Sequence, residues 1–372
     1  MGFLRLFLAL CVIAGHSRTP VFGYVGVNSW YAVNLFFIIS GFYMAMVLNE
    51  KYKDAPVLSF YKSRALRLYP TYFVGLIIAL IVSWDVYAQA FSLLSISSKI
   101  LFVIQNTLIF GQDTSFLICA KLATGACQNP ILMTPNPPAW SLSVELIFYI
   151  VAPFIVKSPI KTFAYFVFGL IYLLMLNFVS YPISSLSLFS IAQNTSFFYY
   201  WYPSSFVFFA MGAMGYQFSK GMISGKIYPI AIISFIASTY TVTIMPLWQM
   251  AIIGVAIPTL FSITKHNKID RIIGEMSFPA YILHFPILTF IERHVSDYPY
   301  IFENVTIGTT VALCSCTIGL ILYLTMEKYL DRIRHDRFSF SGSCEAPAFV
   351  KFIIIPAILS MPLFTIAYIV YQ

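Results

Sequence analysis

Charged residues are scarce in this chain of 372 residues, where Lys, Arg, Asp and Glu together make up 10%. Hydrophobic residues account for 59%, and the mean hydropathy is +0.83. A soluble fold needs a more polar surface, so this composition excludes a soluble protein and indicates an integral membrane protein. The net charge of +8 is then explained by membrane topology, and nucleic acid is not an expected partner.

Hydrophilic stretches long enough to form a soluble domain are also missing. The longest are 49–69, 112–139 and 327–348, and each is too short to bury a core of its own. The five histidines and six cysteines include no HxxxH and no CxxC pattern, so the sequence predicts no metal site. Cys119 and Cys127 share one loop, where they either form a disulfide or remain free thiols.

Apolar runs that can cross a bilayer follow one another along the whole chain. They predict an all-α, polytopic membrane bundle of about ten to eleven transmembrane helices. The runs are 3–17, 30–48, 70–84, 140–156, 161–178, 201–218, 227–243, 248–264, 277–292, 303–326 and 349–371.

A further apolar run at 98–111 is shorter than the roughly 20 residues that a spanning helix usually needs. If this run does not cross and the N-terminus is cytoplasmic, 18 of the 22 basic residues fall in inner loops. If it crosses, every later loop changes side and the positive-inside bias is lost. We therefore expect 98–111 to be a re-entrant or interfacial helix, with the C-terminus extracytoplasmic.

Two ionisable residues lie on the first apolar run, "RLFLALCVIAGH". On a helix, Arg5 and His16 would be about 16 Å apart along the axis and only about 20° apart around it, so they share a face. Ionisable groups at membrane depth are costly and mark functional sites. The alternatives are a snorkelling anchor for Arg5 and an interfacial position for His16.

Polar residues on two other helices are expected at a depth similar to that of His16. "VNLFFIISGF" contains Asn34, with Ser40 as a further candidate, and "PPAWSLSVELIFY" places Trp140 at the interface and Glu145 one turn deeper. A histidine held by an acid or an amide, away from water, is suited to act as a general base. We therefore expect His16, Asn34 and Glu145 to form a catalytic group.

Basic residues gather in "FYKSRALRLYP", just before the third predicted helix. Lys62, Arg64 and Arg67 either bind anionic lipid or form a cradle for the phosphates of a nucleotide-like cofactor.

A second intramembrane histidine lies in "GEMSFPAYILHFPI". This stretch is expected to place Glu275 and Ser277 at an inner helix start and His284 near the midplane. His284 either has a direct role or is hydrogen-bonded to a neighbouring carbonyl.

Five stretches, taken in order, resemble the acyltransferase 3 family of membrane-bound acyltransferases. They are the Arg-x10-His spacing, "VNLFFIISGF", "KSRALRLYP", "WSLSVELIFY" and "GEMSFPAYILH", and they span about residues 5 to 290. The resemblance implies transfer of an acyl group, usually acetyl, from cytoplasmic acetyl-CoA. The acceptor it implies is a hydroxyl of an extracytoplasmic envelope glycan such as O-antigen or exopolysaccharide.

The family motifs are carried over residue by residue. The resemblance implies that His16 is the essential histidine, that Arg5, Arg64 and Arg67 bind the cofactor, and that Glu145 is the acid. The second motif usually has an acid where this chain has Asn34. An amide can still orient an imidazole, so Asn34 remains a candidate and Glu145 is expected to compensate.

We expect residues 1–340 to form the acyltransferase domain and 341–372 to form a linker and a final helix. The expected location is a bacterial inner membrane. A transporter or flippase is the main alternative, because it would also place polar residues in a helical bundle. A third alternative is a non-enzymatic partner in a membrane assembly, but such a role does not explain the intramembrane charges.

Overall fold

The fold is helical, as expected for a polytopic bundle. It was obtained as a computed structural model that describes residues 1–116, 120–125, 127, 128, 133–184, 199–223, 226, 228, 230, 231, 233, 234 and 248–337. The only strands in these ranges are β1 (Ala120–Lys121) and β2 (Cys127–Gln128), which pair antiparallel.

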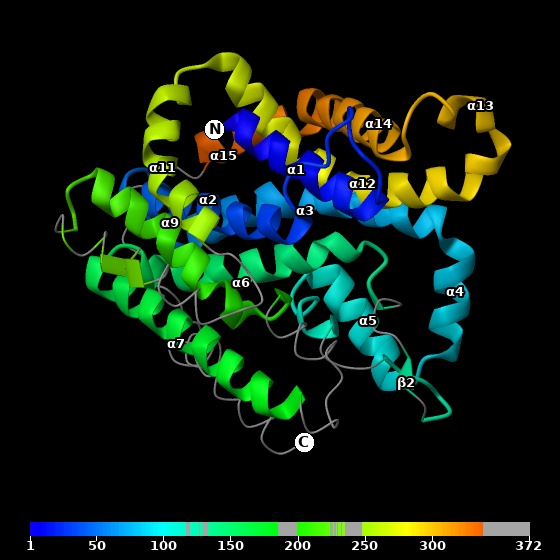
Figure 1. Cartoon of the computed structure of the whole chain (residues 1–372), viewed down its shortest axis with the longest axis horizontal. Coiled ribbons are helices and arrows are strands. Elements are labelled where there is room, and N and C mark those ends of the chain that lie inside the picture. Colours follow the sequence, from blue (N-terminus) through cyan, green and yellow to red (C-terminus); the bar gives the residue numbers. More distant parts are fainter. Residues whose placement is uncertain are drawn as a thin grey trace. The chain divides into compact units, whose positions relative to one another are not determined.

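The order of the helices along the chain can be followed in Figure 1. The α-helices are α1 (Gly2–Ser17), α2 (Ser29–Asn49), α3 (Val57–Val82), α4 (Trp84–Leu93), α5 (Ile96–Leu108), α6 (Trp140–Ile155), α7 (Pro159–Ser184), α9 (Phe206–Ser219), α11 (Trp248–Thr264), α12 (Lys268–His294), α13 (Pro299–Phe302), α14 (Ile307–Leu322) and α15 (Lys328–Arg337). The 3-10 turns are η1 (Thr114–Phe116), η3 (Pro137–Ala139), η4 (Tyr202–Ser205) and η5 (Val295–Asp297), and η6 (Tyr323–Glu327) is a π-helical turn.

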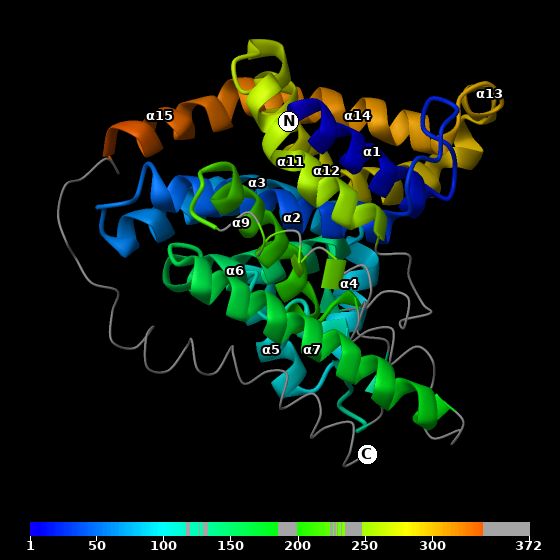
Figure 2. The same cartoon turned by 60° about the vertical axis from the view of Figure 1, so that its left-hand side comes forward.

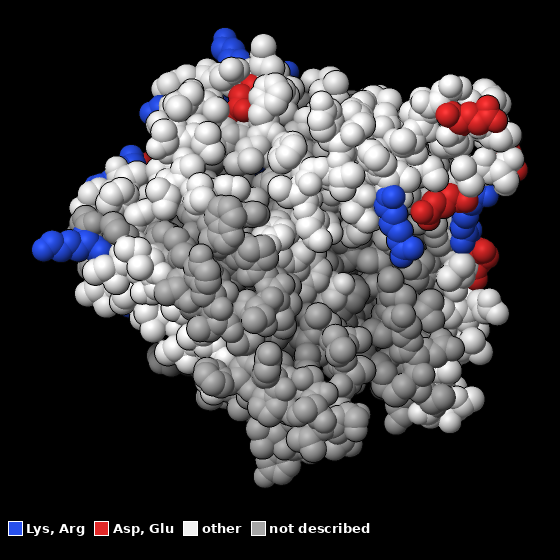
Figure 3. All heavy atoms as spheres, viewed as in Figure 1, with Lys and Arg blue, Asp and Glu red and all other residues white. Residues whose placement is uncertain are grey.

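Five helical segments in the described part of the chain are long and apolar enough to cross a membrane. They begin at Ser29, Val57, Pro137, Lys268 and Ile307, and shorter apolar helices accompany them. The surface visible in Figure 3 is mostly uncharged, with charged side chains in a few small groups. The predicted helix at 349–371, most of 227–243, and Cys119 of the possible disulfide lie outside the described residues.

Two predicted helix starts are wrong. α3 begins at Val57, so Lys62, Arg64 and Arg67 lie within the helix and not before it. α12 begins at Lys268, so Glu275 is in its interior. Lys, Arg, Ala and Leu are good helix formers and are present in the added part of α3, and Lys, Arg, Glu and Met are present in that of α12.

The chain forms two compact units. The first unit comprises Met1–Val33, Ser63–Ser143 and Phe261–Arg337. The second unit comprises the described residues of Asn34–Lys62 and Val144–Leu260. All contacts given below lie within one unit.

In the first unit, α1 and α12 lie side by side and run in the same direction (Figures 1 and 2). The backbone N–H of Gly2 donates to the carboxylate of Asp270, and Gly2 also packs directly against Gly274. One helix length further on, His16 contacts His284. A side chain at Gly2 or Gly274 would overlap the backbone of the other helix, so these two glycines allow the close approach.

α3 runs parallel to α12 as well. Gly75 lies against Ile282, and at the far end Arg293 donates to the carbonyl of Val82 at 2.9 Å. Arg293 also donates to Asp85 at 2.9 Å, and this hydrogen bond holds the pKa of the Asp85 carboxyl below its usual value. The first unit therefore contains three parallel helices.

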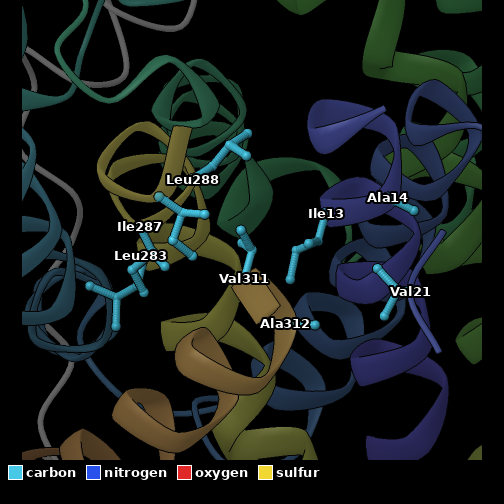
Figure 4. Close-up of a cluster of buried hydrophobic side chains, with 9 residues drawn as sticks. Ile13, Ala14, Val21, Leu283, Ile287, Leu288, Val311 and Ala312 are labelled. Atoms are coloured by element: carbon cyan, nitrogen blue, oxygen red, sulfur yellow. The ribbon is translucent and has the colours of Figure 1, made fainter. Parts of the chain in front are cut away.

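α14 runs in the opposite direction and completes the core of this unit. Gly308 at its start packs against Thr19, which follows α1, and Gly319 packs against Ala280 in the first half of α12. Apolar side chains from α1, α12 and α14, together with Val21, form the cluster drawn in Figure 4. Its buried members are Ile13, Ala14, Val21, Leu283, Ile287, Leu288, Ile291, Val311 and Ala312.

The second unit is built around α2, α6, α7 and α9. Gly41 of α2 and Gly212 of α9 each lie against the backbone of the other helix. Phe148 of α6 stacks on Phe209 of α9, with ring centroids 4.0 Å apart. These contacts join three helices through small residues and aromatic rings, as is common in membrane bundles.

Candidate active site

His16 and His284 form a hydrogen-bonded pair between α1 and α12. Nδ1 of His16 is 2.7 Å from Nε2 of His284. The two ring planes differ by 13° and their centroids are 5.0 Å apart, so the nitrogens are the nearest parts of the rings. The contact is therefore an edge-to-edge N–H···N bond.

The two histidines differ in exposure. His284 has no accessible surface, whereas His16 is only half-buried. The Nδ1 atom of His284 is hydrogen-bonded to the carbonyl oxygen of Tyr281, one turn earlier on α12. The rings of Tyr281 and Phe285 also contact His284. Only His16 of this pair has surface left for another molecule.

The start of α6 lies beside this pair. The hydroxyl groups of Ser141 and Tyr281 are 2.8 Å apart, and both hydroxyls are within hydrogen-bond distance of the carbonyl of Pro138. Pro138 precedes α6 in turn η3, as expected for a helix start. Trp140 is 5% exposed, so its side chain is packed inside the protein, and its depth in the membrane stays a prediction.

The start of α6 is attached to α12 at a backbone carbonyl that a proline leaves without its helical partner. Pro286 has no N–H, so it cannot bond to the carbonyl of Ile282 four residues earlier. Nδ2 of Asn136 donates to that carbonyl at 3.0 Å. The loop before α6 is thus attached to α12 within one turn of His284.

A second group of charges lies at the other end of α1. Arg67 of α3 pairs with Glu275 of α12, and its Nη1 is 3.5 Å from Oε2 of Glu327 in the π-turn η6. Oε1 of Glu327 accepts a hydrogen bond from Thr71 at 2.6 Å. Arg67 therefore lies between two carboxylates, which compensate its charge.

Further arginines surround these carboxylates. The guanidinium of Arg5 lies beside Gly274 and acts electrostatically on Glu275 and Glu327. Arg334 pairs with Asp331 at 2.7 Å and also interacts electrostatically with Arg64 and Arg67. Among the groups named here, arginines 5, 64, 67 and 334 outnumber Glu275, Glu327 and Asp331 by one, which gives this cluster a positive excess.

Glu145 lies in the second unit, where Ser40 of α2 and Tyr149 of α6 both hold its Oε1. The Ser40 hydroxyl donates at 2.6 Å and the Tyr149 hydroxyl at 2.5 Å. Asn34 is also buried in this unit, at 3% exposure. The expected pairing of His16 with an acid stays a prediction, because His16 lies in the first unit and Glu145 in the second. His16 has a second imidazole as its partner, and Glu145 has two hydroxyls.

Several residues of these arrangements were not predicted. Tyr281 and Ser141 lie in the quoted motifs, but only tertiary contact shows that their hydroxyls meet. Thr71, Glu327 and Arg334 lie outside the motifs. An acid at the end of the apolar run 303–326 was the available signal for Glu327. Among the residues that the structure describes, no group of three His, Cys, Asp or Glu is placed to hold a metal ion.

The apolar helices indicate an integral membrane protein, and the histidine pair is embedded in its helical bundle. The family model described as acyltransferase domain (acyltransferase 3) matches residues 1–326. The match covers most of the chain, so the protein belongs to the acyltransferase 3 family and is a membrane acyltransferase. Comparison with curated proteins and with solved structures finds no match.

Proposed function

We propose that this protein is a membrane-bound O-acyltransferase, specifically an O-acetyltransferase. It moves the acetyl group of cytoplasmic acetyl-CoA to a hydroxyl of an extracytoplasmic envelope glycan. The observation that carries the proposal is the arrangement on α1, where the His16–His284 pair and the Arg5 charge cluster lie at opposite ends of one helix. Their separation is about 16 Å along the axis.

The two ends of α1 suit the two ends of acetyl-CoA. The positive excess around Arg5 and Arg64 attracts the phosphates of the nucleotide, since guanidinium groups match phosphate geometry. Arg67, held by Glu275 and Glu327, belongs to the same cluster and fixes its geometry. The extended pantetheine arm then bridges the distance to His16.

In the reaction, the hydroxyl oxygen of the acceptor attacks the carbonyl carbon of the thioester. His16 takes the hydroxyl proton as the new C–O bond forms. The C–S bond breaks, and the proton passes to the departing thiolate to give CoA and the acetylated glycan. We assign Glu145, oriented by Ser40 and Tyr149, as the acidic residue that the family resemblance implies, with Asn34 as a polar residue of the same unit.

The test uses membranes that contain the wild type, His16→Ala or His294→Ala, supplied with acetyl-CoA labelled in its acetyl group. The label is followed into the envelope glycan fraction. We expect transfer with the wild type, a loss of about 10²-fold or more with His16→Ala, and no change with His294→Ala. His294 is the matched control because it is an exposed histidine on α12.

Transfer that persists in His16→Ala would refute the role of His16 as the base. If no variant transfers label, binding of acetyl-CoA to the purified protein separates the remaining explanations. Binding without transfer points to a different acceptor, and no binding favours a transporter.

A further inference from the structure

The Tyr281 carbonyl fixes the position of the proton on His284. A carbonyl oxygen can only accept a hydrogen bond, so Nδ1 of His284 must carry the proton that it donates to Tyr281. A neutral imidazole has one N–H, and Nε2 of His284 is therefore an acceptor. Its partner at 2.7 Å, Nδ1 of His16, must then be the donor.

The same reasoning gives the tautomer of His16. If Nδ1 of His16 carries the proton, its Nε2 has the free lone pair. Which nitrogen of a histidine is basic is set by the hydrogen bond that the other nitrogen makes. The chain of bonds from His16 to His284 to the Tyr281 carbonyl thus leaves a single basic nitrogen, and it belongs to the half-buried ring.

We propose that His284 is a positioning residue that accepts the Nδ1–H of His16 and thereby presents Nε2 of His16 as the proton acceptor. This inference rests on the proposed function for its role in acyl transfer. His284 takes the place that a carboxylate occupies in a Ser-His-Asp triad, which also binds Nδ1–H and orients the ring. It has no accessible surface, so it acts only through His16.

In one alternative, His284 is a positively charged imidazolium with a proton on both ring nitrogens. It would make Nδ1 of His16 an acceptor and leave no basic nitrogen on His16. A fully buried cation is costly without an anionic partner, and the ring contacts of His284 are with Tyr281, Phe285 and His16. The neutral pair is therefore the favoured state.

The first test is spectroscopic and needs no substrate. The full-length protein is labelled with ¹⁵N-histidine, and its imidazole nitrogens are classified as protonated or unprotonated at neutral pH. The variants His16→Gln, His284→Gln and His294→Gln assign the signals. We expect both His16 and His284 to be protonated at Nδ1 and bare at Nε2. An Nε2–H tautomer of His16, or an imidazolium at His284, would overturn the inference.

The second test separates positioning from packing. In His284→Phe the ring remains but the acceptor is removed, whereas the amide oxygen of His284→Gln can still accept from His16. We expect His284→Phe to lower kcat by about 10²-fold with little change in KM for acetyl-CoA. His284→Gln should recover at least about tenfold of that loss, because an acceptor for Nδ1–H is restored.

The control is His294→Phe. His294 makes the same kind of contact, from Nδ1 to the Phe290 carbonyl at 2.8 Å, but it is exposed. Its substitution should leave kcat unchanged. A kcat for His284→Phe within twofold of wild type would refute the positioning role.

The two tests separate failure of the inference from failure of the proposed function. The predicted tautomers in a protein that transfers no acetyl group would refute only the function. Acetyl transfer by a protein whose His16 carries its proton on Nε2 would refute only the inference.

Discussion

At the scale of single residues, Arg67 is a largely buried charge with two acidic partners. Its side chain is 14% exposed and lies between Glu275 and Glu327. We expect Arg67→Met to lower the free energy of unfolding by about 3–5 kcal/mol, because two largely buried carboxylates lose their shared cation. The measurement is the unfolding transition of the detergent-purified protein.

Two further variants make this prediction specific. Arg293→Met removes a cation from an exposed pair with Asp85 and should shift the transition little. Adding Glu327→Gln to Arg67→Met should recover part of the loss, since one unpaired carboxylate is removed. If Arg67→Met is no more harmful than Arg293→Met, Arg67 is not a structural ion pair.

The sequence assigns polar residues to predicted helices, but it does not show which of these residues contact one another. The Arg5–His16 spacing follows from helix geometry, and both residues lie on α1 as expected. The partner of His16 could not be derived, because the order of helices in the membrane plane is not encoded in hydropathy. Within the first unit that partner is His284, and the expected pairing with Glu145 stays a prediction.

At the scale of elements, the contact between Asn136 and α12 replaces a hydrogen bond that Pro286 removes. We expect Asn136→Ala to lower the free energy of unfolding by about 1–3 kcal/mol, because the buried carbonyl of Ile282 loses its donor. In the Pro286→Ala background, the N–H of residue 286 can bond to that carbonyl within the helix. The cost of Asn136→Ala should then be smaller.

A double-mutant cycle measures this coupling. The four proteins are the wild type, the two single variants and the double variant, and their unfolding free energies are compared. A coupling of about 1 kcal/mol is expected for a hydrogen bond of this kind. Strictly additive costs would contradict the explanation given for the start of α6.

The bounds of helices that are apolar over their whole length were predicted closely, whereas the bounds of helices with polar ends were not. α6 covers Trp140–Ile155, close to the predicted run 140–156. α3 and α12 begin well before their apolar runs, because hydropathy marks the part of a helix that suits lipid and not the helix itself. The short α4 was not predicted, since it has neither the length nor the apolar run of a span.

At the scale of the whole molecule, the direction of the helices bears on the membrane topology. α1, α3 and α12 are parallel within the first unit. Parallel α3 and α12 need an odd number of crossings between them. The runs 140–156, 161–178, 201–218, 227–243 and 248–264 give five, and counting 98–111 as well would give six. If all five of these runs cross, the parallel arrangement requires that α5 does not.

The number of crossings between α3 and α12 can be tested by labelling single-cysteine variants. The background is a protein in which the six native cysteines are replaced by serine. Asp85→Cys follows α3, Asp297→Cys follows α12, and Lys268→Cys is at the start of α12; all three positions are exposed. A membrane-impermeant maleimide should label positions 85 and 297 from the same face of sealed vesicles and position 268 only from the other face. With the N-terminus cytoplasmic, positions 85 and 297 are the extracytoplasmic ones. Labelling of 85 and 297 from opposite faces would mean that the number of crossings between α3 and α12 is even, and α5 would then be the first candidate for the additional span.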